Sequence, residues 1–175
     1  MAITLVFSIF IDFITRNSYN KYNIGGVLMK YIRVSTDLEV SIHDFPTGNY
    51  FEQNMKLKEQ IGDLCDLYEV VRPKRLYKEL GHKCNITENT GESVCMLIDE
   101  EGLIKKGMSP NLVASFLYEA DKHGTPIMGN VLFVGLKNSE DGMDLCGIQD
   151  DVCGKLKNQL LNIINSINNI KKRKE

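Results

Sequence analysis

The sequence predicts an α+β fold: a single domain with a mainly antiparallel sheet, helices on one face of the sheet and a long C-terminal helix. Three observations predict it. The chain has 175 residues, of which 43% are hydrophobic and 25% are charged, as in one globular domain. Short alternating or apolar segments bounded by turn residues are typical of paired strands. A segment near the C-terminus repeats apolar residues at helical spacing.

The first 28 residues are interpreted as a translated leader, with the natural start at Met29. Residues 2–14 form an apolar run that is shorter than the roughly 20 residues of a membrane-spanning helix. The run also lacks the basic start and the cleavage site of a secretory signal. Gly25 and Gly26 precede Met29, and glycine codons can contain a bacterial ribosome-binding site. We therefore expect an α+β domain over residues 29–150, then a helix with a basic tail over residues 151–175.

The first half of this domain predicts a hairpin, a helix and a strand. Residues 31–35 and 38–42 alternate apolar and polar side chains around a Thr-Asp turn, which predicts a β-hairpin. Asn49 is a suitable N-cap for a helix that extends to about residue 66. Residues 67–71 predict a third strand that Pro73 ends. The polar stretch 74–91 is expected to be an exposed loop or the tip of a hairpin.

The second half predicts two core strands and two helices. Residues 93–98 (SVCMLI) and 127–136 (IMGNVLFVGL) predict buried strands. Residues 110–118 between them predict a short helix whose apolar side chains, including Leu117 and Phe116, face the core. The final helix is expected to begin at Asp150 and Asp151, because acidic side chains favour the positive end of the helix dipole.

The final helix carries apolar residues every three or four positions, as in a short heptad pattern. These residues are Cys153, Leu156, Leu160, Ile163, Ile167 and Ile170. One interpretation is a long helix that packs on its own sheet, and the other is pairing with a second chain. The outer half extends beyond a domain of this size, where isoleucines left in water would be unfavourable. We therefore predict that Ile163, Ile167 and Ile170 form a homodimer or contact a partner.

Charge and cysteine content restrict the function. A formal net charge of −2 gives no overall attraction to nucleic acid or to acidic membranes. No pair of the five cysteines has C-x-x-C spacing, and only His82 and Cys84 approach the spacing of metal ligands. We predict no metal, no cofactor and no membrane association, with reduced thiols in a cytoplasmic protein.

Short motifs follow one another between Tyr68 and Leu145, in the stretches LYEVV, CMLIDEEGLIKKGMSPNLVASFLY and HGTPIMGNVLFVG. These stretches resemble domain of unknown function 3846, a family of phage and mobile-element proteins. The positions that match its motifs are Asp99, Glu101, Gly102, Pro110, Asn111, Ala114, Ser115, Tyr118, Gly124, Pro126, Ile127, Gly129 and Asn130. The resemblance implies an association with mobile elements and transfers no catalytic residue.

Two groups of residues are candidates for binding. One joins hydrogen-bonding side chains to flexible glycines and suits a small polar ligand or a partner loop: Asn111, Ser115, Tyr118, His123 and Asn130. The alternative is structural, with the first residue as a helix cap. The other group places cations around an aromatic ring and suits phosphate or nucleic acid: Arg72, Lys74, Arg75, Tyr77 and Lys78. The alternative is a solvated basic loop.

The expected function is that of a non-enzymatic accessory protein of a phage or mobile genetic element, which acts by binding and modulates a host system. Its partner is expected to be a protein or a small polar ligand. One alternative is a protein that binds a nucleotide or nucleic acid. Another is a small hydrolase that uses Ser115 and His123, with Asp99 as the orienting acid, although the chain has no Gly-x-Ser-x-Gly elbow.

Overall fold

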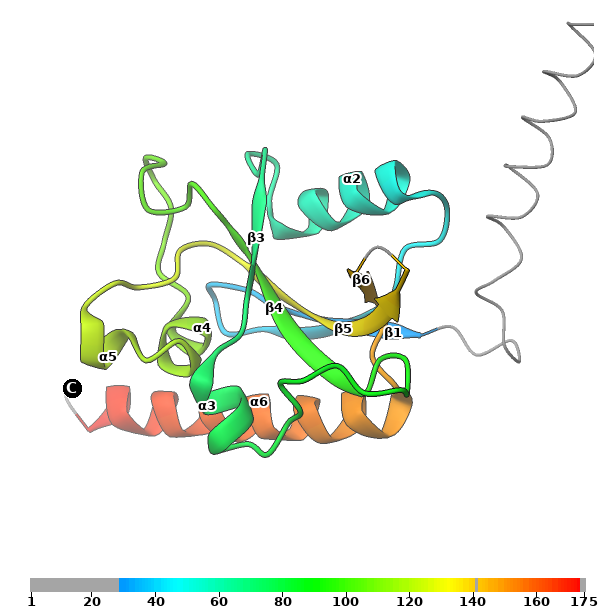
Figure 1. Ribbon diagram of the computed structural model, residues 1–175. Coiled ribbons are helices and arrows are strands. Elements are labelled where there is room, and N and C mark those ends of the chain that lie inside the picture. The colour runs from blue at the N-terminus through cyan, green and yellow to red at the C-terminus, as the bar shows by residue number, and fades with distance from the viewer. Residues whose placement is uncertain (1–28, 141, 174–175) are drawn as a thin grey trace, which may run out of the picture.

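The computed structural model describes residues 29–140 and 142–173, which form one six-stranded antiparallel sheet with helices packed on it (Figure 1). The strands are β1 (Lys30–Val34), β2 (Val40–Asp44), β3 (Tyr68–Val71), β4 (Ser93–Asp99), β5 (Val131–Ser139) and β6 (Gly142–Cys146). The helices are α2 (Tyr50–Ile61), α3 (Lys74–Lys78), α4 (Leu112–Leu117), α5 (Ala120–His123) and α6 (Asp150–Lys172). The predicted α+β class and the long C-terminal helix are confirmed. The predicted leader, residues 1–28, lies outside the described residues.

The central strand of the sheet is β5. The strand order is β2-β1-β5-β4-β3, and β6 also pairs with β5. The first part of β5 pairs with β1 through Val131–Phe133, and the rest pairs with β6 through Gly135–Ser139. Strands β2 and β3 lie at the two edges of this order. The hairpin of β5 and β6 was not predicted from the sequence.

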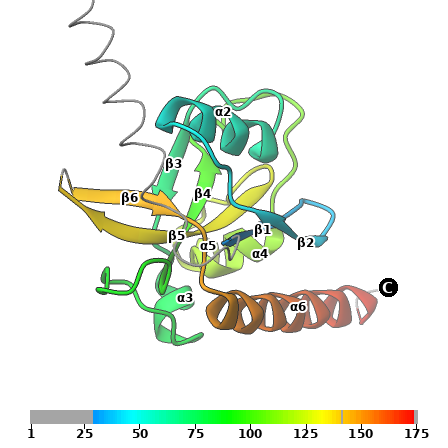
Figure 2. The same ribbon diagram turned by 90° about the vertical axis from the view of Figure 1, so that its right-hand side faces the viewer.

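Helices cover both faces of the sheet, which corrects the expectation of helices on one face only. Figure 2 shows α2 on one side and α6 on the other. Strands β4 and β5 are buried on both faces: Met96 and Phe133 belong to the core under α6, whereas Leu97 and Leu132 belong to the core under α2. Alternate residues of a strand point to opposite faces, so a continuous apolar run needs a cover on each side.

Helix α2 begins at the predicted cap. The side chain of Asn49 accepts a hydrogen bond from the Glu52 amide at 3.0 Å, and the Glu52 carboxylate accepts one from the Asn49 amide at 3.0 Å. This capping box satisfies amides that have no partner within the helix. Leu57 and Ile61 attach the helix to the sheet. The helix ends at Ile61, earlier than predicted, because Gly62 interrupts it.

The segment predicted as an exposed loop contains helix α3. Pro73 precedes the helix, where its fixed φ is compatible with helix initiation and its missing amide costs nothing. Leu76 is fully buried, and Arg75 is buried beside it. The prediction of a loop was wrong for residues 74–78, because five residues with three cations show too little periodicity to reveal one buried leucine.

Three glycines let backbone segments cross closely at the start of α6. The amide of Gly91 donates to the carbonyl of Leu136 at 3.0 Å, and the carbonyl of Gly91 accepts from the Gln149 amide at 3.0 Å. A Cβ atom on Gly135 would lie 2.9 Å from the Cα atom of Gly91, and one on Gly147 would lie 2.8 Å from the carbonyl carbon of Met29. This crossing sets where α6 begins and the direction in which it runs across the sheet.

Candidate functional site

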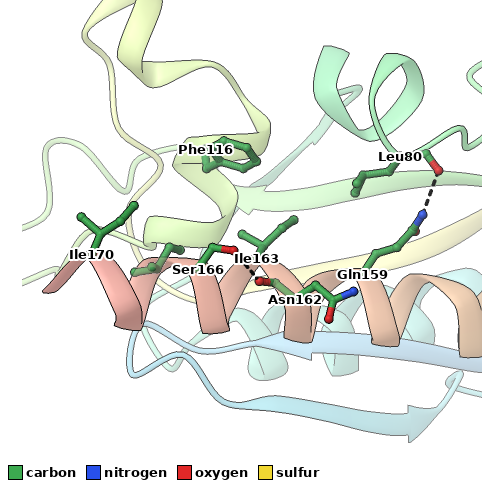
Figure 3. Close-up of a pocket in the computed structure, with 8 residues that line it drawn as sticks. Leu80, Phe116, Gln159, Asn162, Ile163, Ser166 and Ile170 are labelled. Carbon is green, nitrogen blue, oxygen red and sulfur yellow. Dashed lines mark hydrogen bonds between the residues drawn. The ribbon is translucent and has the colours of Figure 1, made fainter. Parts of the chain in front are cut away.

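An apolar groove runs along the outer half of α6 (Figure 3). Its volume is about 280 Å³. Phe116 and Leu80 lie on one side of it, and isoleucines of α6 lie on the other. We call this the α6 groove and define it by Leu80, Phe116, Ile163, Ile167 and Ile170.

The α6 side of the groove follows from the period of a straight helix. The buried residues of α6 are Cys153, Leu156, Leu160 and Ile164. At 3.6 residues per turn, the buried stripe of the helix continues from Leu160 to Ile164. Ile163 and Ile167 therefore lie beside this stripe rather than within it. Both are half-buried, whereas the side chain of Ile170 is 56% exposed. The three isoleucines predicted as a contact site therefore do lie together on one surface. Pairing with a second chain stays a prediction.

The other side of the groove depends on Phe116, which was expected to face the core. Phe116 is 39% exposed, whereas its neighbours Ser115 and Leu117 are buried. The inward positions of α4 are taken by Val113, Ala114 and Leu117. A helix of six residues cannot bury every apolar side chain, so the ring of Phe116 turns toward the groove.

Arg75 fixes the position of Phe116. The guanidinium lies over the Phe116 ring, 4.4 Å from its centroid, and donates to the Phe116 carbonyl at 2.7 Å. It also binds both carboxylate oxygens of Asp121 at 2.8 Å and lies 3.3 Å from Glu79. The hydrogen bond to Asp121 raises the pKa of Arg75 and lowers that of Asp121. One buried cation thus connects α3, α4 and α5 behind the groove.

The inner end of the groove is fixed by a buried histidine. His82 Nε2 donates to Gln159 Oε1 at 2.6 Å, and Gln159 Nε2 donates to the carbonyl of Leu80 at 2.9 Å. Burial lowers the pKa of His82, because the charged imidazolium is poorly solvated there. Neutral His82 therefore helps to connect the segment after α3 to α6.

The stability of the protein is expected to decrease as the pH falls through the normal range of histidine. The folded state has the lower His82 pKa, so the unfolded chain binds the proton first, and stability is complete only above the unfolded pKa, near 6.5. Urea denaturation at about pH 7.5 and about pH 5.5 measures the loss. His82→Gln should remove part of this pH dependence, and His123→Gln, an exposed control, should not. Equal pH dependence in the wild type and His82→Gln would contradict the prediction.

The basic group predicted for phosphate is separated by the fold. Arg72, Lys74 and Lys78 are exposed, whereas Arg75 is occupied by the contacts described above. The hydroxyl of Tyr77 donates to the carbonyl of Val94 at 2.6 Å, and burial raises its pKa. Neither Arg75 nor Tyr77 is thus placed to contact a nucleotide in this conformation. Binding of phosphate by the three exposed cations stays a prediction.

The polar group predicted for a ligand is bonded mainly to the backbone. Fully buried Asn111 donates to the carbonyls of Val34 and Gly129 and accepts from the Ala114 amide. Asn130 donates to the carbonyl of Ile61 and accepts from the Thr36 amide. The structural alternative accounts for both asparagines. A ligand-binding role for them stays a prediction.

The residues of the proposed hydrolase make separate contacts. Ser115 Oγ accepts from the Ile127 amide at 2.9 Å. His123 is exposed, bonds to the carbonyl of Tyr118 at 2.8 Å and packs edge-on against the Tyr118 ring. Asp99 is buried and binds Lys105 through both carboxylate oxygens. No hydrogen bond of the described residues joins Ser115, His123 and Asp99 into a relay.

The cysteines are free thiols. Burial raises the pKa of Cys65 to about 11 and those of Cys95 and Cys146 to about 12, so these thiols are protonated at neutral pH. Residues 29–140 and 142–173 contain no group of three His, Cys, Asp or Glu side chains that could hold a metal ion. No helix in this described part is long and apolar enough to cross a membrane.

One side of the groove and a second cavity were not predicted from the sequence. Leu80 and Phe116 are far from α6 in the sequence, and no local pattern indicates that they approach it. The second cavity has a volume of about 500 Å³ and lies between the end of β2 and α2, over Tyr31. Its residues come from three separate segments, so spacing along the chain could not have revealed it.

Comparison with known proteins identifies a family. No curated protein and no solved structure matches the chain. A family model, described as Domain of unknown function (DUF3846), matches residues 55–160. That match covers more than half of the chain and contains all the motifs from Tyr68 to Leu145. The chain therefore belongs to the DUF3846 family.

Proposed function

We propose that this protein is a non-enzymatic accessory protein that binds a protein partner through the α6 groove. The observation that supports the proposal is an apolar groove beside Ile170, an isoleucine that the fold leaves 56% exposed. Apolar side chains that line a concave surface are typical of protein-binding sites. The wall opposite α6 is held by Arg75 and Gln159, so the groove is preformed rather than assembled on binding.

The groove suits a short amphipathic helix. It extends from Gln159 to Ile170, which is about 16 Å along α6 at 1.5 Å per residue, or three helical turns. The three exposed cations Lys171, Lys172 and Arg173 lie just beyond its outer end. We therefore propose a partner helix with an apolar stripe and an acidic residue at the end that contacts these cations.

The biological setting of the proposal comes from the family. The motifs shared with DUF3846 support an origin in a phage or mobile genetic element, and the partner is then a host protein in the cytoplasm. A homodimer through Ile163, Ile167 and Ile170 is the competing use of the same surface. Binding of a nucleotide or nucleic acid is not favoured, because Arg75 and Tyr77 are occupied within the fold.

Ile170→Asp is expected to remove partner binding without changing the stability of the fold. The substitution places a charge at the outer end of the groove, where the wild-type side chain is already exposed. Leu161→Asp is the matched control: Leu161 is 39% exposed on the same helix and does not line the groove. Tagged variants are compared by affinity purification from host cells and quantitative mass spectrometry. A host protein is expected with the wild type and Leu161→Asp and not with Ile170→Asp.

The salt dependence of binding and the molecular mass in solution distinguish the competing proposals. Contact with an apolar groove should persist between about 50 and 200 mM salt, whereas binding of a labelled single-stranded oligonucleotide should weaken steeply. Oligonucleotide binding that requires Arg72 and Lys74 would replace this proposal with the nucleic-acid alternative. Light scattering that finds a dimer in the wild type and a monomer in Ile170→Asp would show that a second copy occupies the groove. Equal recovery of host proteins by the wild type and both variants would also overturn the proposal that the groove binds a partner.

A further inference from the structure

Strand β2 has an open backbone edge. It is the terminal strand of the sheet and pairs with β1 alone among the described strands. The amide of Phe45 donates to the carbonyl of Met29 at 2.8 Å, and the amide of Ser35 donates to the carbonyl of Glu39 at 3.0 Å. Backbone groups of an antiparallel strand alternate in direction, so residues 39, 41, 43 and 45 face β1. The amides and carbonyls of Val40, Ile42 and Asp44 therefore face outward.

The two faces of this edge differ in chemistry. Tyr31 pairs with His43 across the β1–β2 ladder, and Tyr31 belongs to the core under α2. Their rings stack at 5.2 Å, and His43 Nε2 bonds to Ser41 Oγ at 2.8 Å. The intervening side chain of Ile42 points to the opposite face and is 39% exposed. A strand added beside β2 would thus meet polar and aromatic groups on one face and an apolar group on the other.

A cavity adjoins the polar face of the edge. It has a volume of about 500 Å³ and is bounded by Phe45, Pro46, Thr47, Lys56 and Gln60. Tyr31 also lines it, and its hydroxyl makes no hydrogen bond to another described residue. The cavity therefore offers a hydrogen-bonding group to a side chain that enters it.

We propose that β2 and this cavity bind an extended peptide segment of a partner protein, which adds a strand to the sheet. Backbone hydrogen bonds to Val40, Ile42 and Asp44 hold the segment, and one side chain enters the cavity. Lys56 and Glu59 are exposed at the cavity and carry charges of opposite sign. Asp44, which also lines it, forms an ion pair with Lys30. The side chain that fits is therefore neutral, with an apolar body and a polar end, as in tyrosine. The cavity lies against α2, whereas the α6 groove lies along the helix that covers the other face of the sheet. Figure 2 shows these two helices on opposite sides of the sheet.

A second copy of the chain is a poorer occupant. Two copies of β2 that pair symmetrically about Ile42 would place Glu39 of one copy opposite Phe45 of the other. Glu39 would then bring a further negative charge to the cavity, where the charges of Asp44 and Glu59 are already matched by Lys30 and Lys56. A charged group that is not compensated is costly to bury at an interface. A peptide of another protein does not have this constraint.

Substitution of Ile42 tests the backbone contact. Ile42→Pro removes an outward amide without removing a hydrogen bond to β1, so the fold should persist. The probe is a fluorescein-labelled peptide, acetyl-Thr-Val-Tyr-Val-Thr, whose binding to the full chain is measured by fluorescence anisotropy. Ile42→Pro should weaken binding about tenfold, whereas the control Ile42→Val, which keeps the amide, should not. Circular dichroism verifies that both variants are folded.

A second variant tests the cavity. Thr47 is exposed in the turn at the cavity rim, so Thr47→Trp should fill the cavity and leave the fold intact. It should abolish binding of the tyrosine peptide, and a peptide with aspartate in place of tyrosine should bind the wild type at least about tenfold more weakly. The proposal is overturned by an absence of binding up to about 1 mM peptide. It is also overturned if both variants bind like the wild type, or if light scattering finds a dimer that Ile42→Pro dissociates.

Discussion

Replacing Gly135 by alanine is expected to lower the free energy of unfolding by about 3 kcal/mol or more, and is the substitution with the largest effect predicted for this protein. Gly135 lies within β5, where an added Cβ atom would be 2.9 Å from both the carbonyl carbon of Gly147 and the Cα atom of Gly91. It would lie closer still to the carbonyl oxygen of Gly147. All three of these atoms belong to backbone, so no side-chain rotation can relieve the clash.

The cost extends to α6, because the same crossing leads into that helix. The carbonyl of Gly91 accepts from the Gln149 amide, and the Ile148 amide donates to the carbonyl of Lys30 at 2.7 Å. Moving residues 147–149 away from β5 would disturb both hydrogen bonds. It would also displace Ile148, which is fully buried. Secondary structure and α6 packing are therefore expected to be lost together.

Gly154→Ala is the matched control for this prediction. Gly154 lies inside α6, and a Cβ atom added there would meet nothing within 4 Å. Alanine is favoured over glycine within a helix, so this variant should be more stable than the wild type by up to about 1 kcal/mol. Urea denaturation followed by far-ultraviolet circular dichroism measures both variants. A Gly135→Ala variant as stable as the wild type would show that the backbone crossing is looser than described.

The sequence predicted most elements of this fold, for reasons that can be stated for each. Strands β4 and β5 are continuous apolar runs, and the Asn49 cap and the acidic start at Asp150 are local signals that need no knowledge of distant residues. Helix α3 was missed because a single buried leucine gives no period. The hairpin partner β6, which pairs with β5 through Gly142–Cys146, was missed because its residues alternate only weakly between apolar and polar.

The candidate site was predictable on one side only. Isoleucines repeated along α6 indicated a contact surface, because apolar residues at helical spacing are visible in the sequence. The opposite side consists of Phe116 and Leu80, which the fold of α3 and α4 brings to α6. Tyr31 and His43 show the same limit: they become neighbours only through the register of β1 and β2. Contacts between distant segments leave no periodic pattern.

Asn111, in the family motif Pro110-Asn111, had two interpretations in the sequence: a ligand-binding residue or a helix cap. Asn111 caps α4, as Asn49 caps α2, and in each case the side-chain oxygen accepts from the amide three residues later at 3.0 Å. The two caps differ in the hydrogen bonds of the side-chain nitrogen, Nδ2. That of Asn111 donates to the carbonyls of Val34 at 3.0 Å and Gly129 at 3.1 Å. It therefore holds β1, α4 and the start of β5 together.

Asn111→Ala is accordingly expected to destabilise the protein by about 2 to 3 kcal/mol, the second-largest effect predicted here. Loss of a helix cap costs about 1 kcal/mol, which is the whole effect expected for Asn49→Ala, because Asn49 is exposed. The remaining cost arises because two buried carbonyls lose their shared donor, and Asn111 itself is fully buried.

Asn111→Ser separates the two contributions, because serine can cap the helix but cannot reach both carbonyls. It should recover only about 1 kcal/mol of the loss, and chemical denaturation of the four proteins provides the comparison. Equal losses for Asn111→Ala and Asn49→Ala would mean that the buried donor contributes nothing. The other contacts between β1, α4 and the start of β5 would then be sufficient to hold these segments together.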